Sequence, residues 1–111
     1  MRITVTARHC EVSDELRLRA RTLLERLSKV ATRPHDGQVI FSADHGVPTA
    51  EVRLHTARGV VHVGTAEGAD HRSALDRAAA RVRRQLDKAA PKKLKRRRVA
   101  AARRALEREH P

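Results

Sequence analysis

The hydrophobic periodicity of this chain changes several times, and the order of these changes limits the folds it can adopt. Arg2–Arg8 alternates polar and apolar side chains, which is typical of a strand with one buried face. The later segments are helical, then alternating three times, then helical again: residues 14–30, 39–43, 51–56, 60–65 and 70–90. The predicted element order is therefore β-α-β-β-β-α.

This order predicts an α+β fold. A right-handed crossover makes the first two strands parallel, and hairpins make the remaining pairs antiparallel. We expect a four-stranded mixed sheet with both helices packed on one face. The predicted core is aliphatic apart from one ring: Ile3, Val5, Leu16, Leu23, Leu27, Val39, Phe41, Val52, Leu54, Val61, Val63, Leu75, Val82 and Leu86.

Turn and capping residues set the expected boundaries. Ser13 and Asp70 are suited to cap the two helices at their N-termini. Pro91 should end or kink the second helix. We therefore predict an α+β domain over residues 1–90, followed by a basic, flexible tail over residues 91–111.

The last hairpin is predicted from the dipeptide Arg58-Gly59, taken as a two-residue turn. With this turn Leu54 lies opposite Val63 on the core face. His55 then lies opposite His62 on the other face, so the two imidazoles would be neighbours.

The charge balance points to a polyanionic partner. The chain carries 25 Lys and Arg residues against 13 Asp and Glu residues, a formal net charge of +12. Such an excess on a small protein is typical of nucleic-acid binding. Phe41 is the only aromatic residue among Phe, Tyr and Trp, which excludes a base-stacking platform of the RRM type.

The basic residues have a pattern. At about 100° per residue, the spacing i, i+4, i+7, i+11 places four cations on one helical stripe opposite the apolar face. The stripe leads into a run in which six of seven residues are cationic. The predicted polyanion-binding residues are Arg77, Arg81, Arg84, Lys88, Lys92, Lys93, Lys95, Arg96, Arg97 and Arg98.

No catalytic constellation or cofactor motif is found in the sequence. A metal-dependent hydrolase using His55 and His62 is an alternative, but zinc sites require three or four protein ligands. Cys10 is the only cysteine, so no intrachain disulfide can form. With no apolar stretch of about 18 residues and no signal-peptide pattern, we expect a cytoplasmic non-enzyme without a cofactor, a membrane partner or a small-molecule substrate.

Several short motifs, in order, resemble the ribosome hibernation promoting factor family, which includes ribosome-associated inhibitor A. They are the opening strand, Val12-Ser13 before Leu16-Arg17, Ala50-Glu51-Val52-Arg53-Leu54-His55, Gly59, Asp70, Ala74-Leu75-Asp76, and Arg84-Gln85-Leu86 before the basic tail. The resemblance covers residues 1–98 and matches the short form, an N-terminal domain only.

The resemblance implies a bacterial translation inhibitor that acts in stationary phase and stress. Such a protein binds the small (30S) ribosomal subunit in the mRNA–tRNA channel, contacts rRNA phosphates with basic helices and stabilises idle ribosomes. We expect a monomer in isolation. The alternatives are a stand-alone binder of double-stranded RNA or DNA, and the modulation of a sigma factor named in an older label of the family.

Overall fold

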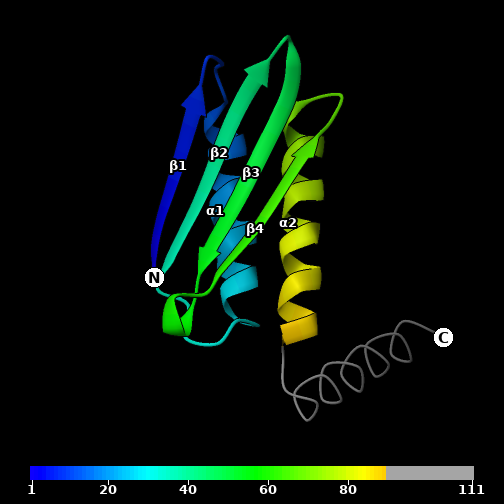
Figure 1. Ribbon diagram of the computed structural model, residues 1–111. Helices are drawn as coiled ribbons and strands as arrows, with labels where there is room; N and C mark the ends of the chain where they lie inside the picture. Colours follow the sequence, from blue (N-terminus) through cyan, green and yellow to red (C-terminus); the bar gives the residue numbers. More distant parts are fainter. Residues whose placement is uncertain (90–111) are drawn as a thin grey trace, which may run out of the picture.

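The computed structural model describes residues 1–89, and Figure 1 shows a four-stranded sheet with both helices on one face. The predicted α+β fold and element order are confirmed. The predicted tail lies outside the described residues. In chain order the elements are β1 (Arg2–Arg8), α1 (Asp14–Ser28), β2 (Asp36–Asp44), β3 (Val47–His55), the 3-10 turn η1 (Ala57–Gly59), β4 (Val61–Glu67) and α2 (His71–Ala89).

The strands lie in the order β1-β2-β3-β4. β1 pairs with β2 in parallel, and the other two pairs are antiparallel. β1 and β4 are therefore the edge strands. No helix of the described part of the chain is long and apolar enough to cross a membrane.

The core lies between the sheet and the helices, and alanines make it thin. Phe41, Leu24, Leu54 and Leu75 are fully buried. The buried face of α2 also carries Ala74, Ala78 and Ala79, and β3 and β4 contribute Ala50 and Ala66. Because these side chains are small, α2 can approach the sheet closely.

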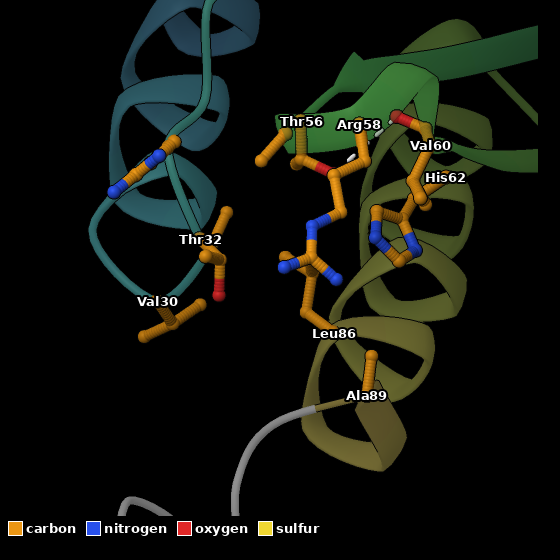
Figure 2. A pocket seen from close by; sticks show the side chains of 11 residues that line it. Val30, Thr32, Thr56, Arg58, Val60, His62, Leu86 and Ala89 are labelled. Carbon is orange, nitrogen blue, oxygen red and sulfur yellow. Dashed lines mark hydrogen bonds between the residues drawn. The ribbon is translucent and has the colours of Figure 1, made fainter.

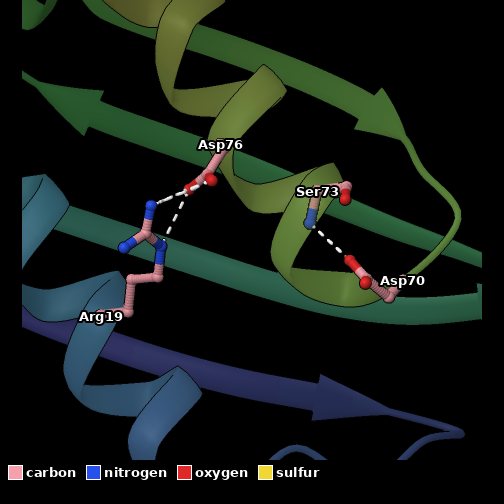
Figure 3. A network of polar contacts seen from close by, with 4 residues as sticks. All are labelled: Arg19, Asp70, Ser73 and Asp76. Carbon is pink, nitrogen blue, oxygen red and sulfur yellow. Dashed lines mark hydrogen bonds and ion pairs between the residues drawn. The ribbon is translucent and has the colours of Figure 1, made fainter.

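The predicted caps at the N-termini of both helices are confirmed. The Leu16 amide donates to the Ser13 hydroxyl at 3.1 Å, and the Ser73 amide donates to the Asp70 carboxylate at 2.7 Å. Figure 3 shows the Asp70 cap beside a second polar contact, in which the Arg19 guanidinium of α1 binds the Asp76 carboxylate of α2 through two nitrogens, at 3.0 and 2.9 Å. This bidentate ion pair joins the two helices on the outer side of the core.

The hairpin between β2 and β3 is tighter than the sequence indicated. Asp44 pairs with Val47, so the turn holds only two residues. Both have left-handed backbones, with φ of 55° at His45 and 78° at Gly46, as a type I′ turn requires. The two strands are correspondingly longer than predicted.

The predicted register of the last hairpin is wrong by one residue. The loop holds three residues, Ala57 to Gly59, and the Thr56 amide donates to the Val60 carbonyl at 2.9 Å. Leu54 therefore lies opposite His62, where the prediction had Val63. A shift of one residue moves every side chain of a strand to its other face.

Two predicted core residues are consequently on the surface. Val61 is 42% exposed and Val63 is 38% exposed, both on the sheet face that carries no helix. Gly64 and Ala66 take their places against α2 and are buried. The core predictions in the other strands and in both helices are confirmed, with Ile3, Val5, Leu16 and Leu23 partly buried at its margin.

Candidate RNA-binding surface

The four predicted cations of α2 lie together on its exposed side. Arg77, Arg81, Arg84 and Lys88 are all exposed, whereas Val82 and Leu86 on the opposite side are buried. The predicted stripe therefore exists as a surface of the folded protein. We call these four residues the α2 stripe.

Two members of the stripe also have a structural role that the sequence did not indicate. The Arg77 guanidinium donates to the Glu67 carbonyl at 3.1 Å, and the Arg81 guanidinium donates to the Thr65 carbonyl. One turn further along, the Gln85 side-chain amide donates to the Val63 carbonyl at 2.6 Å. The three acceptors lie on the edge of β4 that pairs with no strand.

The spacing of these contacts follows from elementary geometry. Four residues of helix rise about 6 Å, and two residues of strand rise about 6.7 Å. Donors at every fourth helical residue therefore match carbonyls at every second strand residue. Only knowledge of which strand forms the edge could have revealed this from the sequence.

Edge contacts do not use up the binding capacity of these arginines. A guanidinium has five N–H donors in a rigid fork, and each contact uses one nitrogen. The contact holds Arg77 and Arg81 in fixed directions along the helix. Arg84 makes no hydrogen bond or ion pair with another residue of the described part of the chain.

Two acids lie next to the stripe in sequence, and each has an arginine partner outside it: Asp76 pairs with Arg19, and Asp87 pairs with Arg83. Arg83 lies 3.4 Å from Asp87 at i, i+4 spacing, and both are nearly half exposed. An exposed pair of this kind contributes about 0.2–1 kcal/mol and weakens in salt. The α2 stripe itself contains no acidic residue.

Some basic residues of α1 bind other parts of the protein, and others are exposed, as in α2. Arg17 donates to the Val5 carbonyl at 3.3 Å, on the opposite edge strand, and Arg19 is paired with Asp76. Arg21, Arg26 and Lys29 are exposed. The predicted binding residues from Lys92 to Arg98 lie outside the described residues.

The proposed histidine pair does not form. His55 lies on the open face of the sheet, whereas His62 lies on the side that faces the helices, because of the changed register. The ring next to His55 is that of His35, with 6.1 Å between ring centroids. Within residues 1–89 no group of three or more His, Cys, Asp or Glu side chains could hold a metal ion. The hydrolase hypothesis thus loses its two paired ligands.

Fold and surface together define a small basic α+β domain with one strongly cationic helix. A family model described as sigma 54 modulation protein / S30EA ribosomal protein matches residues 3–94, and the chain belongs to this family. Its members are ribosome-associated modulation and hibernation proteins, so the resemblance seen in the sequence is confirmed.

Several solved structures are similar to this chain, including the two that follow. The N-terminal domain of Protein Y from Thermus thermophilus shares 26% sequence identity, covering 78% of this chain and 96% of that one, with a TM-score of 0.66. A ribosomal subunit interface protein from Coxiella burnetii shares 20% identity, covers 79% and 96% of the two chains, and gives a TM-score of 0.68. The second likeness concerns the fold alone. Among curated protein sequences, none matches this chain.

Proposed function

We propose that this protein binds the small ribosomal subunit in the channel for mRNA and tRNA, inhibits translation and stabilises idle ribosomes. In this proposal the α2 stripe and the basic residues 92–98 contact rRNA phosphates, and the protein works in the cytoplasm as a monomer without catalysis. The observation that carries the proposal is the α2 stripe, four exposed cations on one helical face with no acid among them.

Phosphate binding suits this surface for two reasons. Each stripe residue can neutralise about one phosphate and release condensed counterions. Arginine also binds phosphate oxygens through two parallel N–H bonds, so the three arginines of the stripe suit a row of phosphates. Since the described part of the chain carries one aromatic residue among Phe, Tyr and Trp, and that residue is buried, docking of the α2 stripe would depend on shape and phosphates and not on base stacking.

The test should use stripe residues whose loss does not disturb the sheet edge. Arg81 is a poor probe because its guanidinium binds the Thr65 carbonyl. We therefore choose the double variant Arg84→Gln and Lys88→Gln. Affinity for purified small subunits should fall, and the slope of log affinity against log salt should flatten by about one to two units, given about 0.7–0.9 per phosphate. Inhibition of translation in a cell extract should weaken in parallel.

The matched control is the double variant Arg2→Gln and Arg8→Gln. It removes the same charge from β1, at the other edge of the sheet, where both side chains are exposed. It should keep the affinity and the salt slope nearly unchanged. Equal effects of both double variants would show that only net charge matters and would contradict a binding role for the stripe.

A competition experiment separates this function from plain duplex binding. A double-stranded RNA or DNA of mixed sequence, added in excess, should not displace the protein from the subunit. Displacement at equal phosphate concentration would favour the stand-alone duplex binder.

A further inference from the structure

A cavity of about 490 Å³ lies at the end of the sheet where η1 joins β3 to β4. Figure 2 shows it between the chain that leaves α1, the η1 turn and the C-terminal end of α2. The α2 stripe reaches this end of the molecule at Lys88, beside the lining residue Ala89. We call it the η1 pocket.

The η1 pocket combines basic and apolar walls. Its three basic lining residues are Arg33, Arg58 and His62, and none of the described residues that line it is acidic. Val30, Val60 and Leu86 supply apolar surface. A pocket with both kinds of wall suits a ligand that has an anionic group and a flat apolar group.

The basic side chains of the η1 pocket have no partner among residues 1–89 that would account for their position. Within residues 1–89, Arg33, Arg58 and His62 form no side-chain hydrogen bond or ion pair. In Figure 2 the Arg58 side chain extends from η1 toward Leu86, next to the His62 ring. No residue of 1–89 therefore occupies its donors, which lie at the pocket.

The backbone gives a second, independent reason to assign a function here. Arg33 and Arg58 both have left-handed backbones, with φ of 48° and 63°. This conformation costs free energy for a residue with a β-carbon and suits glycine or asparagine better. Residues with such backbones gather at functional sites, and two of the four non-glycine cases in residues 1–89 line this cavity, the other two being His9 and His45.

We propose that the η1 pocket binds one nucleotide unit, with its phosphate on Arg58 and Arg33 and its base against Val60, Leu86 and the His62 ring. The unit could come from an unstacked nucleotide of RNA or from a free mononucleotide, which share this chemistry. The RNA source rests on the proposed function, because the subunit would present that nucleotide. The free nucleotide does not depend on it.

The test is a titration of the full chain, labelled with ¹⁵N, followed by NMR. The probes are adenosine monophosphate, single-stranded hexaadenylate and inorganic phosphate. Adenosine monophosphate or hexaadenylate should shift the amide signals of Arg58, Gly59 and His62. Tighter binding of hexaadenylate would identify RNA as the source, and equal or tighter binding of the monophosphate would identify the free nucleotide. Equal shifts with inorganic phosphate would overturn the assignment of the base-binding wall.

Variants decide whether the η1 pocket causes these shifts. Arg58→Asn keeps a residue that tolerates the left-handed backbone but removes the charge, and should weaken binding at least tenfold. Arg58→Lys should restore part of it, and His62→Gln should weaken it as well. Arg8→Gln is the control, because it removes one charge at the opposite end of the sheet. The spectra also report folding, so a misfolded variant would be recognised.

Two outcomes distinguish a failure of the pocket proposal from a failure of the proposed function. If the wild-type chain fails to bind small subunits, the proposed function fails, while the monophosphate titration still decides the pocket. If the α2 variants weaken subunit binding but no probe shifts the pocket signals and Arg58→Asn binds subunits normally, the pocket proposal alone is overturned.

Discussion

Gly64 of β4 faces Ala78 of α2 so closely that a β-carbon at residue 64 would overlap the Ala78 carbonyl oxygen. The same β-carbon would also crowd side-chain atoms of Arg81 and Val82. This close approach brings the edge of β4 within reach of the α2 arginines. A glycine is needed here for space and not for an unusual backbone angle.

Gly64→Ala should therefore destabilise the protein by about 1–3 kcal/mol, the usual cost of overpacking a core. Chemical denaturation of the two proteins measures the difference. Gly46→Asn is the control, because residue 46 has a left-handed backbone that asparagine tolerates and no atom within 4 Å of an added β-carbon. Equal stability of wild type and Gly64→Ala would mean that α2 lies further from β4 than described.

Removal of the three side chains that cover the β4 edge should promote self-association. The triple variant Arg77→Ala, Arg81→Ala and Gln85→Ala uncovers the carbonyls of Val63, Thr65 and Glu67. Exposed edges of this kind pair with other strands, and charged side chains are a common protection. Sedimentation at increasing concentration should show a growing mass. The variant Arg72→Ala with Arg84→Ala removes the same number of charges without uncovering the edge, and should sediment as wild type does.

The observed register of β4 predicts that Val61 and Val63 contribute little to stability, whereas the register expected from the sequence placed both in the core. Val61→Thr and Val63→Thr should each change the free energy of unfolding by no more than about 0.5 kcal/mol, because both side chains are on the open face. Leu54→Ala should cost about 2–5 kcal/mol, since Leu54 is fully buried. Large losses from both valine variants, measured by thermal or chemical unfolding, would instead support the register in which they face the helices.

Acid should destabilise the start of α2. The Ser73 amide donates to the Asp70 carboxylate and holds the pKa of that carboxyl below its usual value, with a smaller contribution from the Ser73 side chain. A depressed pKa in the folded state means that the stabilisation is present above the pKa of the unfolded chain, near 3.9, and is lost as the pH falls through the folded value. The melting temperature of wild type should drop below pH 4 more steeply than that of Asp70→Asn. Asparagine can still cap the helix but does not titrate, so parallel curves would contradict this role for Asp70.

Local sequence patterns determined the elements and their order. The helical spacing of apolar residues such as Leu16, Leu23 and Leu27 predicted α1, and the caps at Ser13 and Asp70 predicted where the helices begin. These signals are local, because a helix repeats every 3.6 residues and a cap acts within one turn. The α2 stripe was predictable for the same reason, since it depends only on spacing along one helix.

Tertiary structure alone decided the register of β4 and hence the site around it. Arg58-Gly59 is compatible with either a two-residue or a three-residue loop. With the longer one, Gly64 is the residue of β4 that faces α2, where a β-carbon would overlap the Ala78 carbonyl oxygen. That choice separates His62 from His55 and brings it to the η1 pocket. It also aligns the carbonyls of β4 with Arg77, Arg81 and Gln85. Such contacts join residues distant in sequence. A shift of one residue leaves the alternating pattern intact but moves each side chain of the strand to the other face of the sheet, so these contacts cannot be predicted from the pattern.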